Sequence, residues 1–367
     1  MNYLSRLKSL QTKFEFDRLD AAFVTHLANI RYLCGFSGSS GILAFSRGVW
    51  ELFTDGRYTE QAKRQVKGAA VRVDALPPLA HAARSIGSKL KRSRGVVRIA
   101  IERDYMTLAM QARLASELEQ AIPRSRLRLI PIAGAVEHLR IRKDKEEIDQ
   151  IRQAADLASS VFPDVLRAIE PQVTENAVAA ELDYLARMSG AEKMSFDTIV
   201  ASGTRSALPH ARPTSEKIGR GFVVLDYGVI LGGYCSDMTR TVWVGRVDRA
   251  MRELYSAVLE AQLSGIAAVR SGTEAQQVDA AARSVLRKRK LDRYFTHSLG
   301  HGVGIEIHES PRLAKGETRI LETGMVVTIE PGVYVPGKGG VRIEDMVLVT
   351  DKGCEVLTPT SKELVIR

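Results

Sequence analysis

Two β-rich stretches, each with a pair of carboxylates around a glycine turn, constrain this chain more than any other feature of its sequence. In the first stretch, residues 222–244, Asp226 and Asp237 flank Gly232 and Gly233, a dipeptide typical of hairpin turns. The midpoint of the two aspartates falls just before Gly232, so we expect them to face each other with Cβ atoms about 5 Å apart. Like charges in that position destabilise a sheet unless a proton or a cation lies between them, and a divalent metal is the natural candidate.

The second stretch, residues 326–349, repeats this construction. Glu330 and Glu344 lie in β-type segments on either side of a glycine-rich connection, and Gly337 within that connection is their midpoint. We therefore expect the two glutamates to face each other as well. An exposed strand face would explain either pair taken alone, but two pairs built alike favour a common site.

Between the two stretches, three of the chain's seven histidines fall within twelve residues: His297, His301 and His308. A fourth, His210, stands just before the first stretch. A lone histidine is most often a hydrogen-bonded structural residue, but neutral imidazole also joins carboxylates in sites for divalent metals. Four carboxylates and one imidazole are too many for a single tetrahedral zinc, and they can hold two metals with bridging carboxylates.

Two metals about 3.5 to 4 Å apart can share a hydroxide and stabilise the oxyanion formed when it attacks a carbonyl. The pattern therefore predicts hydrolysis of an amide or ester, with the remaining histidines moving a proton or binding the developing charge. Side chains two residues apart in a strand share a face, so Arg342 accompanies Glu344 and Thr239 accompanies Asp237. Arg342 then either anchors a substrate carbonyl or carboxylate or forms an ion pair that orients Glu344, and Thr239 hydrogen-bonds to a metal ligand.

The length of 367 residues, at roughly 150 per domain, predicts about two domains. Helical and extended signals alternate before a boundary near residues 131–141, which indicates an α/β domain, and the part after the boundary reads as α+β. No internal repeat is evident. In the first part we expect a helix over residues 3–16 and strands over 21–24, 41–45 and 48–53; in the second, helices that include 148–157, 175–188, 250–269 and 275–289.

Charge and cysteine content exclude several classes of protein. The net charge of +10 is carried by residues 1–135, but no zinc finger, aromatic-rich RNA motif or long basic run accompanies it, so nucleic-acid binding is not expected. The longest apolar runs are a handful of residues, against roughly 20 for a bilayer span, and the first residues lack the apolar core of a signal peptide. The three widely spaced cysteines, Cys34, Cys235 and Cys354, indicate free thiols in a cytoplasmic protein.

The segments that carry these residues resemble the pita-bread metallopeptidases, and among them the Xaa-Pro peptidases, aminopeptidase P and prolidase. The matching segments are Leu-Asp-Tyr-Gly at 225–228, Ser-Asp-Met-Thr-Arg at 236–240, Gly-His-Gly-Val-Gly at 300–304, His-Glu at 308–309, Thr-Ile-Glu-Pro-Gly at 328–332 and Val-Arg-Ile-Glu-Asp at 341–345. Every metal ligand of that family has a counterpart. The resemblance implies two divalent ions per subunit, usually manganese and otherwise cobalt or zinc, held by Asp226, Asp237, His301, Glu330 and Glu344.

The resemblance also implies roles for four further residues on the substrate side. His308 would contact the substrate carbonyl or the intermediate, His210 would guard the substrate pocket, and His297 and Arg342 match the remaining two positions.

The similarity extends over nearly the whole chain, because residues 25–32 and 52–58 resemble the creatinase-type domain that precedes the catalytic unit. It implies a creatinase-like N-terminal α/β domain over residues 1–135 and a pita-bread catalytic domain over residues 136–367. Members are commonly homodimers in which the first domain walls the partner's site, where Arg57 and Tyr58 would contribute; an ordinary surface role is the alternative for both.

The expected activity is that of an Xaa-Pro aminopeptidase: metal-dependent hydrolysis of the bond between an N-terminal residue and proline, in a peptide with proline in the second position. A strict Xaa-Pro dipeptidase, or prolidase, is the alternative because it uses the same ligands. A metal-free creatinase-type hydrolase and a non-catalytic pita-bread binding module are disfavoured, because such proteins tend to lose ligands and none is missing here. We expect a cytoplasmic homodimer with no nucleic-acid or membrane partner.

Overall fold

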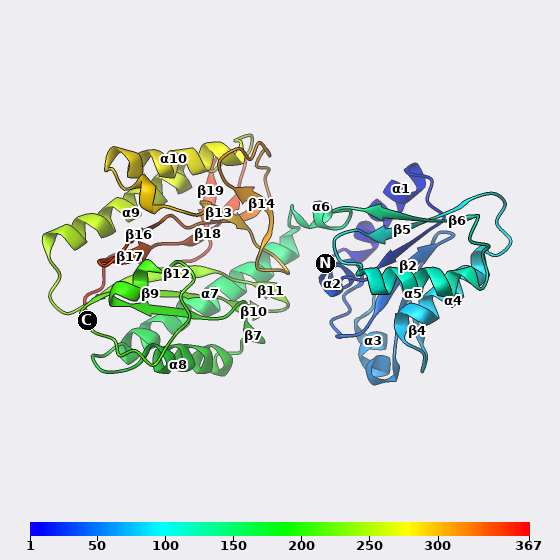
Figure 1. Ribbon diagram of the computed structural model, residues 1–367, viewed down its shortest axis with the longest axis horizontal. Coiled ribbons are helices and arrows are strands. Elements are labelled where there is room, and N and C mark those ends of the chain that lie inside the picture. Colours follow the sequence, from blue (N-terminus) through cyan, green and yellow to red (C-terminus); the bar gives the residue numbers. More distant parts are fainter. The chain divides into compact units, whose positions relative to one another are not determined.

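The computed structural model describes all 367 residues, which divide into two compact units, Met1–Arg140 and Ile141–Arg367 (Figure 1). Each unit has its own sheets and its own hydrophobic core. None of the helices combines the length and the apolar character that crossing a bilayer requires.

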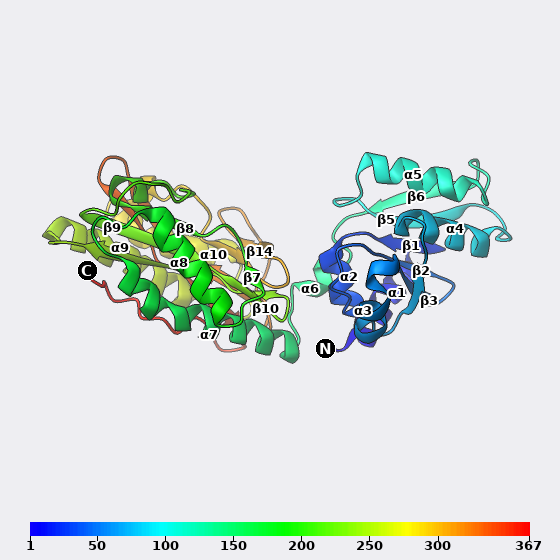
Figure 2. The same ribbon diagram turned by 90° about the horizontal axis from the view of Figure 1, so that it is seen from below.

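The first unit is built on one mixed sheet with the strand order β4-β3-β2-β1-β5-β6. Helices α4 and α5 cover one face, and α1 packs on the other, where Phe14 contacts Phe45 and Trp50 (Figure 2). The strands are β1 (Ala21–Val24), β2 (Ile42–Ser46), β3 (Val49–Thr54), β4 (Ala70–Val73), β5 (Val97–Glu102) and β6 (Leu127–Ile132); the helices are α1 (Tyr3–Phe16), α2 (Leu27–Cys34), α3 (Thr59–Gln65), α4 (Pro78–Leu90), α5 (Leu108–Glu119) and α6 (Glu137–Arg140). The predicted helix and strands of this part, and its α/β class, are confirmed.

The second unit contains four long helices: α7 (Lys145–Ala168), α8 (Glu175–Met188), α9 (Arg249–Ala268) and α10 (Ala275–Lys288). All four were expected from the spacing of apolar residues. Helix α7 begins in a charged stretch because Asp144 and Glu147 form a capping box: each side chain accepts a hydrogen bond from the backbone N–H of the other.

The strands of the second unit lie between these helix pairs (Figure 1). Helices α7 and α8 pack against the sheet β12-β9-β8, and α9 and α10 pack against the sheet β14-β13-β15-β18-β19. The strands are β7 (Lys193–Met194), β8 (Ile199–Ser202), β9 (Gly221–Tyr227), β10 (Val229–Leu231), β11 (Tyr234–Cys235), β12 (Met238–Val244), β13 (Gly300–Gly302), β14 (Glu309–Leu313), β15 (Val326–Ile329), β16 (Gly332–Val335), β17 (Gly339–Arg342), β18 (Asp345–Val349) and β19 (Cys354–Val356).

The two helix pairs form a structural repeat that is not evident in the sequence. The pair α9–α10 reproduces α7–α8 at positions 100 residues later, with the same break between the helices. Buried positions correspond while residue identities differ: Leu182 corresponds to Ala282, and Ala186 to Leu286. The repeat escapes inspection of the sequence because packing preserves which positions are buried, not which apolar residue fills them.

The first carboxylate hairpin, β9 to β12, does not have the predicted register. Asp226 lies opposite Thr239, not Asp237. The turn consists of Gly232 and Gly233, with φ values of 57° and 79°, and both central positions of this kind of turn require positive φ. The glycine pair itself therefore sets the turn, and Asp237 becomes the diagonal neighbour of Asp226.

The second carboxylate hairpin, β15 to β18, has the predicted register. Ile329 lies opposite Asp345 in the outer ladder, and Gly332 lies opposite Arg342 in the inner ladder. Both pairings have Gly337 as their midpoint. Glu330 and Glu344 therefore occupy opposing positions in the gap between the two ladders.

Candidate active site

One cavity of about 730 Å³ in the second unit is lined by all nine side chains that were predicted as metal ligands or catalytic residues. These side chains come from both carboxylate hairpins, from the segment around β13 and from the loop before β9. The structure thus brings together four carboxylates, four imidazoles and one guanidinium from distant parts of the chain: His210, Asp226, Asp237, His297, His301, His308, Glu330, Arg342 and Glu344.

His301 lies among the carboxylates. Potential ligand atoms of Asp237, His301 and Glu344 all lie within 4.8 Å of one another, and His301 Nε2 is 3.4 Å from Glu330 Oε1. His301 Nδ1 lies 3.0 Å from the backbone oxygen of Gly302, and because a carbonyl can only accept, Nδ1 carries the proton. The lone pair on Nε2 therefore faces the carboxylates, as a metal ligand requires.

The carboxylates crowd one another in a buried space. Burial and the charge of Glu344 raise the pKa of Asp237 well above its usual value, burial and the charge of Glu330 do the same for Glu344, and burial raises the pKa of Glu330 to about 8. Asp226 Oδ1 is buried without a hydrogen-bond partner in the chain. Burial also lowers the pKa of His301 to about 4, so this imidazole is neutral. An orphaned carboxylate oxygen beside a neutral imidazole suits a bound divalent cation.

Arg342 forms its ion pair with Asp226 and not with Glu344. Its Nε donates to Thr239 Oγ1 at 3.1 Å, and Nη1 donates to the Tyr334 hydroxyl at 2.7 Å. The ion pair to Glu344, one of the two roles that the sequence left open for Arg342, is absent, because the inner ladder ends at Arg342 and the backbone breaks from it before Glu344. The expected hydrogen bond from Thr239 is present: Oγ1 donates to Glu344 Oε2 at 2.7 Å.

Tyr334 is a site residue that the sequence did not reveal. Its hydroxyl accepts from Arg342 and donates to His297 Nε2 at 2.9 Å, while His297 Nδ1 donates to the backbone oxygen of Ser298 at 2.8 Å. Both nitrogens of His297 are thus engaged within the protein, and burial lowers the pKa of His297 to about 4. A tyrosine in a strand reads as a core residue, so the sequence carries no signal for this link.

His210 and His308 are the exposed imidazoles of the cavity. The ring of His308 lies against that of His301 with centroids 4.3 Å apart. Partial burial lowers the pKa of His308, which the charge of Asp226 opposes, so the imidazole of His308 is neutral near pH 7. These two side chains are the ones free to meet a substrate.

Two further features at the cavity were not foreseen. Arg312 on β14 lies opposite His301 in the sheet, lines the cavity, and makes no hydrogen bond or ion pair within the chain. Lys143 and Glu309 form a buried ion pair at 3.1 Å beside His308. The signal available in the sequence was only that Arg312 follows the His-Glu pair by a few residues, which does not distinguish a site residue from a surface one.

Comparison with known proteins identifies both units. Residues 149–351 match metallopeptidase family M24, and residues 6–142 match the creatinase/prolidase N-terminal domain. Over 235 residues the chain is 46% identical to the Xaa-Pro dipeptidase of Pyrococcus furiosus, a match that covers 64% of this chain and 68% of that protein.

Solved structures of similar proteins cover the whole chain. The Xaa-Pro dipeptidase from Bacillus anthracis is 38% identical and superposes with a TM-score of 0.92 over 100% of both chains. The X-Pro aminopeptidase from Thermotoga maritima is 33% identical, with a TM-score of 0.87 over 95% of this chain and 98% of that one. Similar structures thus include both a protein described as an Xaa-Pro dipeptidase and one described as an X-Pro aminopeptidase.

Proposed function

This chain belongs to metallopeptidase family M24, and from that premise we propose that it is an Xaa-Pro dipeptidase, cleaving the bond between an N-terminal residue and a C-terminal proline. Its architecture, a creatinase-type N-terminal domain followed by a pita-bread peptidase domain, is the one expected from the sequence. Relatives described as dipeptidases favour this alternative over the aminopeptidase we expected first. The observation that carries the proposal is the convergence of the predicted site residues on one cavity.

The proposed metal ligands are Asp226, Asp237, His301, Glu330 and Glu344, and the proposed metals are two manganese ions. The buried, mutually repelling carboxylates and the unpaired Asp226 oxygen support this assignment. Divalent ions bound there would supply a Lewis acid for the scissile carbonyl and lower the pKa of a water molecule.

The chain's own residues prepare this site. Arg342 holds the Asp226 carboxylate in place, Thr239 orients Glu344, and the Nδ1–H of His301 fixes which nitrogen faces the carboxylates. His308 is a neutral imidazole at the cavity wall, so its N–H can donate a hydrogen bond to the substrate carbonyl. Its basic nitrogen can instead accept a proton and then pass it to the departing proline nitrogen. His210 faces the cavity from the loop before β9 and would close the substrate pocket.

Arg312 supports the dipeptidase assignment specifically. A dipeptide carries its free carboxylate directly after proline, and an unpaired guanidinium is the side chain best suited to bind a carboxylate through two hydrogen bonds. In a longer peptide an amide stands at that position, so Arg312 would lose its charged partner.

Peptide length tests this proposal. With added Mn²⁺, the wild-type protein should hydrolyse Ala-Pro at least about 100-fold more efficiently than Ala-Pro-Ala, a difference of about 2.7 kcal/mol. Arg312→Met should raise KM for Ala-Pro about 10-fold or more with a smaller change in kcat, because a bidentate contact to the ground state is lost. Lys315→Met, which removes a nearby exposed cation outside the cavity, is the matched control.

Three results would count against the proposal in different ways. Equal cleavage of Ala-Pro and Ala-Pro-Ala would contradict the dipeptidase assignment and favour an Xaa-Pro aminopeptidase. An Arg312→Met variant with unchanged KM would remove the role of Arg312. No cleavage of any Xaa-Pro bond in the presence of Mn²⁺, Co²⁺ or Zn²⁺ would overturn the peptidase assignment.

We also propose that the protein works as a homodimer in the cytoplasm. Three unpaired cysteines, two of them buried, support a reducing compartment. Light scattering coupled to size-exclusion chromatography tests the dimer: a single peak at the monomer mass of 40.4 kDa would contradict it.

A further inference from the structure

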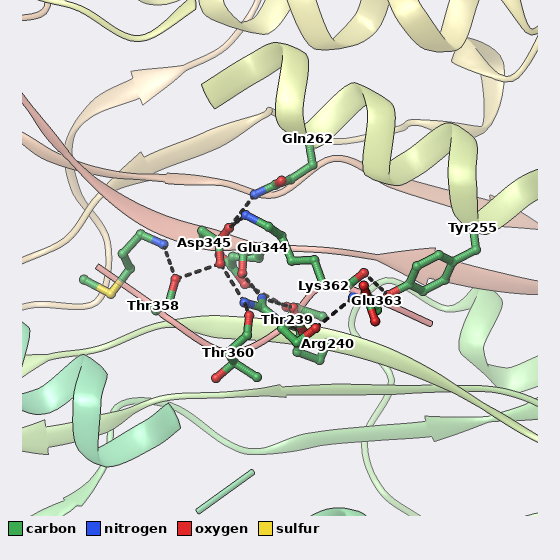
Figure 3. Close-up of polar contacts among 12 residues, drawn as sticks. Thr239, Arg240, Tyr255, Gln262, Glu344, Asp345, Thr358, Thr360, Lys362 and Glu363 are labelled. Carbon is green, nitrogen blue, oxygen red and sulfur yellow. Dashed lines mark hydrogen bonds and ion pairs between the residues drawn. The ribbon is translucent and has the colours of Figure 1, made fainter. Parts of the chain in front are cut away.

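A buried polar network lies directly behind Glu344, and nothing in the proposed mechanism uses it. Figure 3 shows Arg240, Gln262 and Thr358 converging on Asp345, with Lys362 beside them. These five residues come from strands β12 and β18, helix α9 and the segment after β19. We call this group the Arg240–Asp345 clamp.

Arg240 uses every N–H of its guanidinium. Nη1 donates to the backbone oxygens of Thr239 at 2.9 Å and of Glu344 at 2.5 Å. Nη2 donates to Asp345 Oδ1 at 2.7 Å and to the backbone oxygen of Thr360 at 2.6 Å, and Nε donates to that of Ser361 at 3.1 Å. Five donors thus meet five acceptors on three separate segments, which no other side chain could reproduce.

Asp345 is equally saturated, and it is fully buried. Oδ1 accepts from Arg240 and from Thr358 Oγ1, and Oδ2 accepts from Gln262 Nε2 at 2.8 Å and from Lys362 Nζ at 2.5 Å. A carboxylate offers about four acceptor sites, so none is left over. The carboxylate of Asp345 is therefore fully satisfied within the chain, whereas Gln262 Oε1 in the same network is buried without a hydrogen-bond partner.

The clamp lies on the reverse side of two proposed site residues. The Glu344 N–H donates to the Thr239 oxygen at 3.1 Å, and Arg240 holds the carbonyls of both residues. On the cavity side the same two residues are joined by the hydrogen bond from Thr239 Oγ1 to Glu344 Oε2. The clamp therefore fixes the backbone at the point where the two carboxylate hairpins meet, and that backbone cannot shift without breaking these hydrogen bonds.

The chain segment after β19 is part of this arrangement. Residues 358–362 contribute two hydrogen-bonding side chains and two backbone acceptors to the clamp, and Tyr255 on α9 donates to the backbone oxygen of Lys362 at 3.0 Å. The segment thus reaches Glu344 through Arg240 and Asp345, and it is also joined to β18 because the Met346 N–H donates to Thr358 Oγ1 at 3.2 Å. It makes no hydrogen bond or ion pair to a residue that lines the cavity of the proposed site.

We propose that the Arg240–Asp345 clamp is a positioning device that couples the segment 358–362 to Glu344 and sets the affinity of the site for its metal. This inference rests on the metal centre proposed above. Arg240 and Lys362 act through Glu344 and are positioning residues, since neither reaches the cavity. Outer residues of this kind typically change metal affinity about 10- to 100-fold.

Metal binding to full-length protein tests the inference without relying on activity. Mn²⁺ is titrated calorimetrically into chelator-stripped wild type, Arg240→Lys, Lys362→Met and Lys362→Arg, and the unfolding temperature of each metal-free protein is recorded. Lys352→Met is the matched control, because Lys352 is an exposed cation of the same region with no partner in the chain.

We expect the Kd for Mn²⁺ to rise about 10- to 100-fold in Arg240→Lys, since three amine donors cannot replace five fixed ones, and about 3- to 10-fold in Lys362→Met. Lys362→Arg should restore most of the affinity and Lys352→Met should leave it within about twofold. A purely structural role would lower the unfolding temperature of the metal-free variants and leave the Kd unchanged, which would overturn the inference.

The clamp and the proposed function can fail separately. If the wild-type protein binds Mn²⁺ and the folded Lys362→Met variant binds it equally well, the role of the clamp is overturned and the proposed metal centre stands. If Arg240→Lys does not fold, the result for Lys362→Met decides. Wild-type protein that binds no divalent metal removes the proposed metal centre and the clamp's role together.

Discussion

The two carboxylate hairpins follow equivalent helix pairs, yet they are built differently. The first closes on the two-residue turn of Gly232 and Gly233 and contributes Asp226 and Asp237 to the cavity. The second is interrupted between two ladders, where Glu330 and Glu344 lie, and its inner ladder carries Tyr334 and Arg342. The repeat places a pair of carboxylates in each half, but only the second half supplies the cation that holds a carboxylate of the first.

This asymmetry separates the features that place the carboxylates in the cavity from the side chains that orient them. Although the two hairpins differ, each half brings a pair of carboxylates to the cavity. Their charge and orientation depend on side chains that are not repeated, namely Arg342 and Thr239, each of which contacts a carboxylate from an element other than its own.

The strongest test of the comparison removes one proposed metal ligand from each hairpin. Asp237→Asn and Glu344→Gln should each lower kcat/KM toward an Xaa-Pro dipeptide at least about 1000-fold and reduce the bound Mn²⁺, because each removes a buried negative charge that the metal needs. Steady-state kinetics and elemental analysis of the purified variants measure this. A variant of either hairpin that kept wild-type metal content and rate would show that its carboxylate lies outside the metal centre.

A smaller effect is expected where the second hairpin supports the first. Arg342→Met leaves the buried Asp226 without its cation, so we expect kcat/KM to fall about 100-fold and Mn²⁺ to be held with altered affinity. Tyr334→Phe removes one hydroxyl between Arg342 and His297 and should lower kcat/KM about 10-fold. If Tyr334→Phe lowered kcat/KM more than Arg342→Met does, the ion pair from Arg342 to Asp226 would not be the main support that the second hairpin gives the first.

The smallest effect concerns the turns. Gly337 has φ of 74° with open space around its Cα, so Gly337→Ala should cost only about 1 kcal/mol of unfolding free energy. A Cβ at Gly232 would lie 1.8 Å from Gln150 Oε1, the end of a side chain that must move aside, so Gly232→Ala should cost somewhat more unfolding free energy. Thermal unfolding of both variants measures the difference, and an equal or reversed order would contradict the view that the first turn is the tighter constraint.

Much of the fold follows from local patterns in the sequence. The four long helices of the second unit and the α1 helix of the first appear where apolar residues recur at helical spacing, because a helix must bury one face whatever it packs against. The register of the second hairpin also follows from its sequence, since the midpoint of Glu330 and Glu344 coincides with the turn.

The first hairpin shows where such reasoning stops. Symmetry about two aspartates placed its turn one residue too early, because the positive φ values of Gly232 and Gly233, and not the charges, determine where the chain reverses. Gly228 adds to this: a Cβ there would lie 1.8 Å from the Ser236 oxygen, so the strands approach closely just beyond Asp226. Close approach of two backbones is invisible until both are in place.

By itself, the amino-acid sequence determined the residue types, the helical segments and the pairs of carboxylates that a metal-dependent hydrolase needs. Only the tertiary structure decided that Arg342 pairs with Asp226, that Tyr334 joins Arg342 to His297, and that Arg240 and Asp345 lock the backbone behind Glu344. The reason is physical: propensity and periodicity act over neighbouring residues, whereas a buried polar group takes whichever partner the packing of distant segments brings within about 3 Å.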